Sequence, residues 1–286
     1  MVIPTHNRRA PLLRCLHSVL RGAGAASAVY VVDDGCQDGT ADAVRTEYPA
    51  VDLIVGDGSL WWSGAMNLGA RTAIRDGAKW ILVLNDDTEL APDAVTHLIR
   101  RSEANPDAIV GSKVLTRQTG TIWSAGGVER WPWPGLIMRG YGEPDCGQYD
   151  APAEVTWLPG MGTLIRAEHM QELGYYDAVH LPQYYADADL TLRARNLGLR
   201  VLYEPASRVI NDTSTTGLSV RTTRTLLSFL RTFTERRSQR HLPSTLRFYA
   251  RHCPLPWLPV TISWLYARHL AAWLRHGRGA HQAGQG

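Results

Sequence analysis

Three acidic clusters in this sequence are candidates for metal binding or acid–base catalysis. They lie at 33–35 (Asp-Asp-Gly), at 85–87 (Asn-Asp-Asp) and at Asp187 with Asp189. Neighbouring carboxylates repel each other and are costly unless a cation or a hydrogen-bond donor pairs with them. Hard divalent ions such as Mg²⁺ and Mn²⁺ prefer one or two carboxylates together with phosphate oxygens and water. We therefore expect a diphosphate that is bridged to Asp87 through a metal ion.

The elements around these clusters alternate between apolar runs and helical stretches over the first two hundred residues. This alternation is typical of a mostly parallel sheet with crossover helices. Strands are expected at 2–4, 29–33, 52–55, 80–84, 108–110, 155–158, 163–165 and 200–203, and helices at 12–20, 41–48, 66–75, 94–101, 167–173 and 187–196. The first two acidic clusters then follow strands, where open α/β sheets bind ligands. Residues 123–149, rich in Gly, Pro and aromatic residues, predict a long irregular excursion.

The order of the motifs resembles the family 2 inverting glycosyltransferases of GT-A fold. The motifs are Ile3-Pro-Thr-His-Asn-Arg8, Val31-Val-Asp-Asp-Gly35 and Leu84-Asn-Asp-Asp-Thr88, followed in the second half by stretches at 160–166, 173–177 and 184–195. The stretch 60–69 resembles the rhamnosyl- and galactofuranosyltransferase-like branch. The resemblance covers residues 2–215 and implies a mostly parallel nucleotide-binding sheet flanked by helices.

The resemblance also implies roles for individual residues. Thr5, Asp33 and Asp34 would hold the nucleoside, and Asp86 would lie against the ribose or the diphosphate. Beside the resemblance, Asn85 and Trp62 are also expected to contact the nucleotide-sugar donor. Asp34 would accept a hydrogen bond from the base, Asp87 would bind Mg²⁺ or Mn²⁺, and Asp187 would be the catalytic base. Of the adjacent tryptophans at 61–62, one is expected to pack and the other to stack on a sugar or base, because neighbours in an extended strand face opposite ways.

The second half of the chain departs from the family pattern at two places. Ala186 stands where an acidic residue usually precedes the base, and Asn211 stands where a histidine metal ligand is often found. Either Asp212 substitutes as a ligand, or Asp87 and the diphosphate hold the ion.

Gly160 and Trp157 are expected on the acceptor side, with structural packing as the alternative for Trp157.

The implied reaction is an inverting transfer to an acceptor hydroxyl, which belongs to a saccharide or a lipid-linked saccharide. Asp187 would take the hydroxyl proton as the new bond forms. One alternative is a sugar-phosphate nucleotidyltransferase, but the segment 6–9 lacks the glycines of a triphosphate-binding loop. The other is a decayed relative that binds nucleotide or sugar without catalysis.

The charge of the chain divides it into a body and a tail. From residue 213 onward there are eleven Arg, no Lys and a single acid, Glu235, whereas residues 1–212 carry a net negative charge. We expect a catalytic domain over 1–212 and a basic helical tail over 213–286. The tail either contacts an anionic membrane surface or docks on the domain. We expect no nucleic-acid partner and a role in cell-envelope or exported polysaccharide assembly.

The cysteines and the start of the chain bear on its location. The four cysteines form no metal-binding or disulfide spacing, and no secretory signal precedes residue 6. A cytoplasmic enzyme, peripheral on the inner face of the membrane, is therefore expected. The uncharged run 254–266 is too short to span a bilayer, which needs about 20 residues.

Overall fold

A central mixed sheet organises the molecule. The structure is a computed structural model that describes residues 1–22, 27–215 and 225–282. Eight strands follow one another across the sheet in the order β10(Ala153–Glu154), β12(Arg200–Asn211), β6(Ala108–Thr116), β11(Thr163–Arg166), β4(Trp80–Val83), β1(Val2–Thr5), β2(Tyr30–Asp33) and β3(Asp52–Val55). Two short strands extend it, because β5(Thr88–Leu90) pairs with β12 and β7(Ile122–Ser124) pairs with β6.

The direction of the chain through the sheet reverses beside β1. The chain runs outward from β1 to β2 and β3, then returns to β4 on the other side of β1, and all these pairs are parallel. Such a reversal leaves a crevice at the carboxyl ends of the strands, which is where α/β sheets bind ligands. β11 is antiparallel to both β4 and β6, whereas β12 is parallel to β6. The expected mostly parallel sheet flanked by helices is confirmed.

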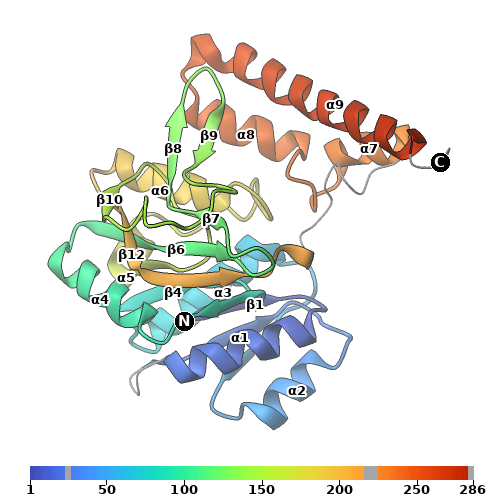
Figure 1. The fold of residues 1–286 in the computed structure, drawn as a ribbon. Helices are drawn as coiled ribbons and strands as arrows, with labels where there is room; N and C mark the ends of the chain where they lie inside the picture. Colours follow the sequence, from blue (N-terminus) through green and yellow to red (C-terminus); the bar gives the residue numbers. More distant parts are fainter. Residues whose placement is uncertain (23–26, 216–224, 283–286) are drawn as a thin grey trace.

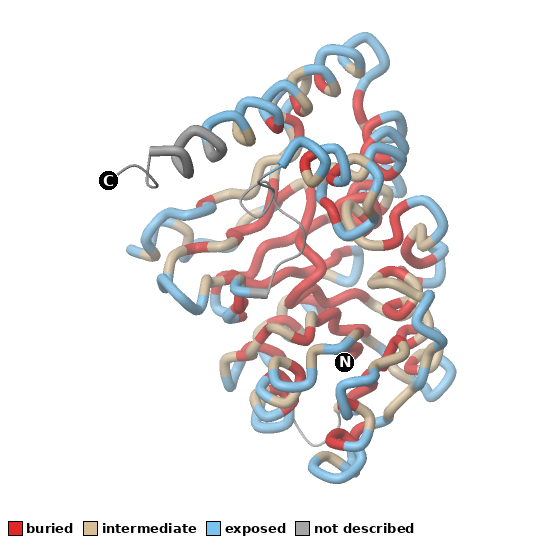
Figure 2. Tube along the Cα trace, turned by 90° about the vertical axis from the view of Figure 1, so that its right-hand side faces the viewer, coloured by how far each residue is buried: buried red, intermediate tan, exposed pale blue. Residues whose placement is uncertain are grey.

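Helices cover both faces of the sheet (Figure 1). Side chains in a strand alternate between faces, so Val2 joins the core beneath α3(Trp61–Arg75), while Ile3 joins the opposite core. That second core also holds buried residues of α1(Arg9–Gly22), α2(Thr40–Glu47) and α4(Ala94–Ala104). Figure 2 shows the resulting buried centre beneath a more exposed outer layer.

The segment 123–149 is more regular than the sequence indicates. It contains the antiparallel hairpin β8(Gly127–Arg130) and β9(Gly135–Met138), which stands out from the main sheet (Figure 1). Each strand has four residues, too few for alternation to be visible among the Gly and Pro residues, and both Trp-Pro bonds in the turn are cis. The strand expected at 155–158 is instead β10 at 153–154, with an isolated bridge between Trp157 and Gly127.

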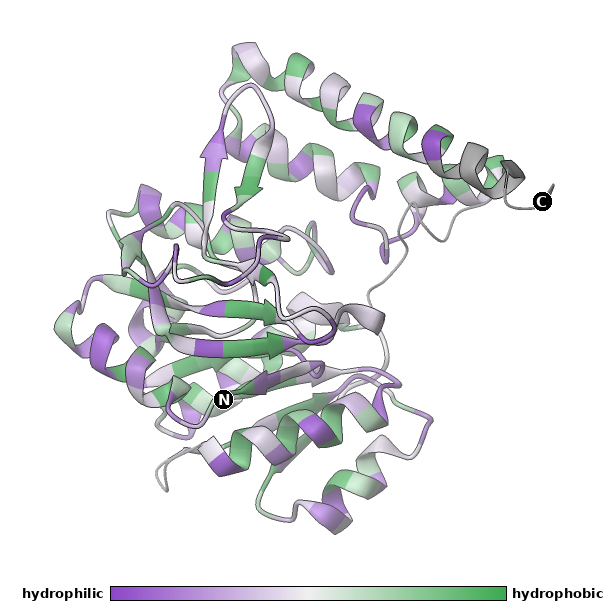
Figure 3. Cartoon of the chain, viewed as in Figure 1, coloured by the Kyte–Doolittle hydropathy of each residue, from purple (hydrophilic) through white to green (hydrophobic). Residues whose placement is uncertain are grey.

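Two of the C-terminal helices, α8 and α9, contact this hairpin. After α5(Ala167–Glu172), α6(Ala186–Asn196) and β12, the chain forms η1(Thr213–Thr215), α7(Leu226–Thr234), α8(Leu242–His252), η3(Leu255–Trp257) and α9(Leu258–Gln282). Thr261 of α9 donates to the carbonyl oxygen of Pro132 in the hairpin turn (2.5 Å), and the rings of Trp131 and Tyr249 meet edge to face. Figure 3 shows α9 as a mixture of hydrophilic and hydrophobic residues, and none of the helices in the described ranges is long and apolar enough to cross a membrane.

Candidate active site

A cavity of about 420 Å³ opens where β1, β2 and β4 end. Its lining includes five of the six residues expected to hold the donor, namely Thr5, Asp34, Trp62, Asn85 and Asp86. The sixth, Asp33, is turned away from the cavity, and its carboxylate accepts a hydrogen bond from the backbone N–H of Cys36 (2.7 Å). Asp33 therefore shapes the loop after β2. We call this space the donor cavity.

The carboxylate of Asp34 is already bound to backbone amides. One oxygen accepts from the N–H groups of Gly58 (2.9 Å) and Leu60 (3.2 Å), and the other from Trp61 (2.9 Å). Since the N-terminus of a helix has unpaired N–H groups and a partial positive charge, this carboxylate stabilises the start of α3. A carboxylate has about four lone-pair sites, so about one remains for a ligand. The recognition of a base by Asp34 stays a prediction.

Asp86 and Asp87 share one arginine at the end of β4. The guanidinium of Arg8 lies 3.1 Å from an Asp86 oxygen and 2.7 Å from Asp87 Oδ2. Thr5 Oγ1 donates to the second oxygen of Asp86 (2.8 Å). Burial, opposed by Arg8 and reinforced by the charge of Asp87, raises the pKa of Asp86 to about 7. The positive charge that two adjacent carboxylates require is thus partly supplied by Arg8.

Asp87 has an oxygen suited to a metal ion. Its Oδ1 is buried and has no hydrogen-bond partner among the described residues, a costly arrangement unless a ligand completes it. A divalent ion that takes one carboxylate oxygen and fills its other positions with diphosphate and water fits this group. In the described parts of the chain, no three His, Cys, Asp or Glu side chains form a metal-binding group.

The second expected metal ligand, Asp212, is turned to other partners. Its Oδ1 accepts from Gln118 (2.6 Å) and from the hydroxyl (2.6 Å) and N–H (3.0 Å) of Ser214, while Oδ2 lies 3.2 Å from Arg14. Only its backbone touches Asp87, through an N–H that donates to the Asp87 carbonyl oxygen (2.9 Å). The structure therefore favours the alternative in which Asp87 and the diphosphate hold the ion.

Asp187 is linked to the donor cavity through Gly160 and Trp62. Its two oxygens accept hydrogen bonds from the N–H groups of Gly160 (2.9 Å) and Ala188 (2.8 Å). A side chain on Gly160 would lie 2.5 Å from the ring of Trp62, so glycine is required for this close approach. Trp62 in turn donates through Nε1 to Asn85 Oδ1 (2.8 Å). Asp187 does not itself line the cavity, but a continuous set of contacts connects it to residues that do.

The environment of Asp187 suits a proton acceptor. Burial raises its pKa, and the hydrogen bonds from the backbone oppose this shift only in part. A general base is most effective when its pKa lies near the working pH. Tyr185, two residues before Asp187, holds a left-handed conformation (φ 71°) at the start of α6, where the Asp187 carboxylate accepts from Gly160.

The contacts of Asp189, in contrast, indicate a structural role. It is completely buried, and its oxygens contact Arg193 (2.8 Å), Arg251 (2.7 Å) and His252 (2.9 Å). Burial acts to raise the pKa of Asp189, but these three partners outweigh it and lower the pKa to about 2. Asp189 thus remains ionised and anchors α8 to α6.

Two expectations about tryptophans need correction. Trp157 is buried, its Nε1 donates to the Val128 carbonyl oxygen (3.3 Å), and it packs against Gly127 beneath the hairpin. The structure therefore gives Trp157 the packing role and not an acceptor groove. Trp61 and Trp62 begin α3 and are not in an extended strand, although both line the donor cavity.

Several lining residues had no assigned role in the sequence. Arg8 lies within a recognised motif, and its charge beside an expected diphosphate was a usable signal. Gln183 and Tyr184 lie just before the Asp187 motif. Arg237 comes from the tail, and nothing in the local sequence distinguishes it from the other arginines there.

Solved structures with the same architecture are glycosyltransferases. GalNAc-T7 with UDP, GalNAc and Mn²⁺ matches with a TM-score of 0.62 and 17% identity over 94% of this chain and 57% of that one. A mannosyltransferase from Pyrobaculum calidifontis with GDP-Man and Mn²⁺ matches with a TM-score of 0.55 and 17% identity, covering 99% and 79% of the two chains. These likenesses establish the GT-A fold.

Sequence comparison leads to the family. The N-acetylglucosaminyl-diphospho-decaprenol L-rhamnosyltransferase of Mycobacterium tuberculosis is 23% identical over 74% of this chain and 75% of its own. The polyprenol monophosphomannose synthase of Mycolicibacterium smegmatis is 27% identical over 72% and 75%. The family model for glycosyl transferase family 2 matches residues 1–144, which include β1, β2, β4 and their acidic ends. With half of its length matched and its fold shared, this chain belongs to glycosyl transferase family 2.

Proposed function

We propose that this glycosyltransferase moves a sugar from a nucleoside-diphosphate donor to an acceptor hydroxyl with inversion at the anomeric carbon. The observation that carries the proposal is the chain of contacts from Asn85 through Trp62 and Gly160 to Asp187. It connects a partly desolvated carboxylate to the cavity at the strand ends. A base on one side of the sugar and a leaving diphosphate on the other is the arrangement that inversion requires.

Residues of the donor cavity have separable tasks in this proposal. Asp34 holds the Gly58–Trp61 backbone, which shapes the wall for the nucleoside. Arg8 and Arg237 lie where they attract the negative charge of a diphosphate. A divalent ion on Asp87 would neutralise charge as the diphosphate leaves. Asp187 accepts the proton from the acceptor hydroxyl while that oxygen attacks the sugar.

The cellular setting belongs to the same proposal. One named relative is a rhamnosyltransferase for N-acetylglucosaminyl-diphospho-decaprenol, and another is a polyprenol monophosphomannose synthase. We therefore propose a lipid-linked saccharide acceptor and a role in cell-envelope polysaccharide assembly. The enzyme would work in the cytoplasm against the membrane surface. Exposed leucines on α7, at 226, 227 and 230, support membrane contact, because apolar side chains beside arginines favour an anionic interface.

Donor hydrolysis tests the proposal most directly. The full-length chain, incubated with a panel of nucleotide sugars and Mn²⁺, should release the nucleoside diphosphate from one of them, and Asp87→Ala should reduce this release strongly. A chain that binds nucleoside diphosphates with Mn²⁺ yet turns over no donor, with or without lipid-linked acceptors, would be a binding protein without catalytic activity.

A further inference from the structure

A second cavity, of about 310 Å³, lies between the β8–β9 hairpin and α9. Residues that are close in sequence line this cavity and the donor cavity. Tyr184 lines the donor cavity and Tyr185 lines the second one, while Arg237 lines the donor cavity and Arg240 the second. The two tyrosines just before α6, the helix that carries Asp187, therefore contribute one to each cavity.

The second cavity has a positive charge that no acid neutralises. Within residues 1–22, 27–215 and 225–282, neither Arg240 nor Arg268 forms an ion pair with a carboxylate. The Arg240 guanidinium donates to the hydroxyl of Tyr185 (3.2 Å) and to the Gln239 carbonyl oxygen (3.3 Å), and the Arg268 guanidinium lies over the ring of Trp264 (4.6 Å). Burial, and then the charge of Arg240, lower the pKa of the neighbouring His269 to about 4. His269 is therefore neutral at pH 7, and the arginines set the charge.

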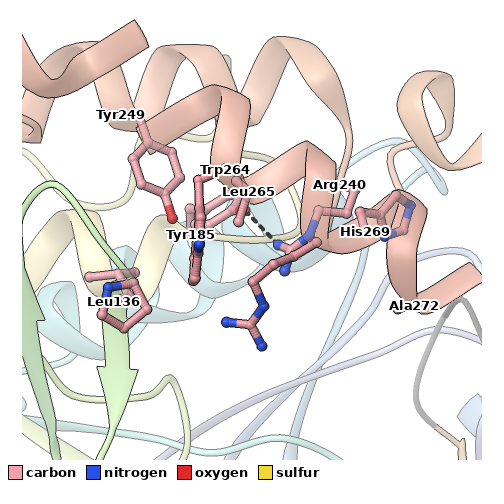
Figure 4. Close-up of a pocket in the computed structure, with 10 residues that line it drawn as sticks. Leu136, Tyr185, Arg240, Tyr249, Trp264, Leu265, His269 and Ala272 are labelled. Atoms are coloured by element: carbon pink, nitrogen blue, oxygen red, sulfur yellow. Dashed lines mark hydrogen bonds between the residues drawn. The ribbon is translucent and has the colours of Figure 1, made fainter. Parts of the chain in front are cut away.

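The rest of the lining is apolar and aromatic. Tyr185, Tyr249 and Trp264 lie close together on one side, and Leu136 lies below them (Figure 4). Pro134, Leu265 and Ala272 complete the apolar part. A ligand that suits this lining has an anionic group with a hydrocarbon chain beside it. Phosphate suits the anionic part, because the planar guanidinium forks of arginine match phosphate oxygens and two arginines can share the charge of one phosphate.

Apolar side chains near the cavity offer a surface for the rest of such a hydrocarbon chain. α7 packs on α9 through Phe229, whose ring stacks on His269 and Trp273. These two helices expose a row of leucines at 226, 227, 230, 270 and 274, which are between 43% and 64% exposed. A hydrocarbon chain too long for the cavity would find apolar surface at these leucines.

We propose that the second cavity binds the phosphate and the first part of the chain of a long-chain alcohol phosphate or diphosphate that carries the acceptor sugar. Arg240 and Arg268 bind the phosphate, and Trp264 and Leu136 contact the chain. The sugar attached to that phosphate then lies beside Tyr185, two residues from Asp187. This inference rests on the proposed function and assigns its acceptor site.

Calorimetry with farnesyl diphosphate on the full-length protein tests the assignment. Farnesyl diphosphate should bind at least about tenfold more tightly than inorganic pyrophosphate or farnesol, since only it has both recognised parts. The double variant Arg240→Gln/Arg268→Gln should weaken this binding by about tenfold or more, as two charge-assisted hydrogen-bonding groups are lost. Melting curves should show that the variant remains folded.

Two matched variants make the test specific. Arg247→Gln removes the same charge from an exposed position on α8 outside the cavity and should leave farnesyl diphosphate binding unchanged. Arg237→Gln lies three residues from Arg240 but in the donor cavity, so it should weaken nucleoside diphosphate binding and leave farnesyl diphosphate binding unchanged.

The opposite results would overturn the assignment. Equal affinity for pyrophosphate and farnesyl diphosphate would indicate a simple anion site, and sensitivity to Arg237→Gln alone would place the ligand in the donor cavity. Nucleoside diphosphate binding with Mn²⁺ is measured separately on the same protein. If that binding is present and farnesyl diphosphate fails to bind, the acceptor site is wrong while the proposed function stands.

Discussion

Replacing Asp187 and Asp189 separately with asparagine tests the division of roles in the first turn of α6. Asp187→Asn removes the proton acceptor, and we expect kcat to fall by about 10²–10⁴-fold. Its stability should change less than that of Asp189→Asn, because asparagine retains one oxygen to accept from Gly160 or Ala188, and the N–H left without a partner costs about 1–3 kcal/mol. Affinity for the nucleoside diphosphate should stay the same.

Asp189→Asn should have the reverse effect. The buried carboxylate contacts Arg193, Arg251 and His252, and removing one partner of such a buried network costs roughly 3–5 kcal/mol. Urea unfolding should therefore show a large loss in the free energy of unfolding. At a temperature where the variant is folded, kcat should remain within about tenfold of the parent, because Asp189 does not touch the reacting groups.

The two carboxylates should also differ in their pH dependence. Asp187 has a raised pKa and must be ionised to act, so the acid limb of kcat should lie at a higher pH than that of an ordinary aspartate. Asp189 has a pKa lowered to about 2. Its contribution to stability is complete above the unfolded pKa of about 4 and is lost as the pH falls toward 2. The difference corresponds to roughly 2–3 kcal/mol, which Asp189→Asn should remove from the acid unfolding curve.

Steady-state kinetics and urea titrations on the two variants decide the matter. A nearly normal kcat in Asp187→Asn, together with a stable but inactive Asp189→Asn, would show that the roles have been assigned to the wrong residues. Loss of both stability and activity in both variants would show that the turn acts as one structural unit, and the separate roles would have to be withdrawn.

Three further outcomes are expected. Asp87→Ala should abolish the Mn²⁺-dependent part of nucleoside diphosphate affinity in calorimetry, and an affinity equal to that of the parent would contradict the role of its buried oxygen. Gly160→Ala would place a methyl group 2.5 Å from the Trp62 ring, so it should lower kcat by at least about tenfold. Its melting curve should remain cooperative, and normal turnover would refute the coupling through Trp62. Replacing the leucines at 226, 227 and 230 with serine should reduce pelleting with anionic liposomes, and added salt should reduce pelleting of the parent; no pelleting by the parent would leave docking as the role of the tail.

The sequence predicted the parallel part of the fold well because its signals are local. Buried parallel strands are nearly continuous apolar runs, and the runs at 29–33 and 80–84 correspond to β2 and β4. Of the acidic residues at the ends of those strands, Asp34 and Asp86 line the donor cavity, whereas Asp33 and Asp87 are not among its lining residues. Five of the six expected donor residues line this cavity, because β1, β2 and β4 are neighbours in the sheet and α3 begins beside their carboxyl ends.

The parts that sequence reasoning missed depend on contacts between distant segments. β5 has three residues and exists because β12 provides a partner far along the chain. The backbone amides that bind Asp34 come from 24 to 27 residues downstream, so the carboxylate looked available to a ligand. Likewise, the charge of Asp212 suggested a metal ligand, but Arg14 and Gln118, which are distant in sequence, take its oxygens.

Contacts between distant segments matter most for function in the tail. The division at residue 212 follows the change in charge and stays a prediction, yet the contacts cross it at the site. Arg251 and His252 of α8 neutralise Asp189 in the helix that carries the expected base. Arg237 lines the donor cavity, and Arg240 donates to Tyr185 at the turn before Asp187. A chain cut after residue 212 would leave Asp189 buried with Arg193 alone and would lose one wall of both cavities. The basic tail therefore helps to form the proposed active site, whether or not it also binds a membrane.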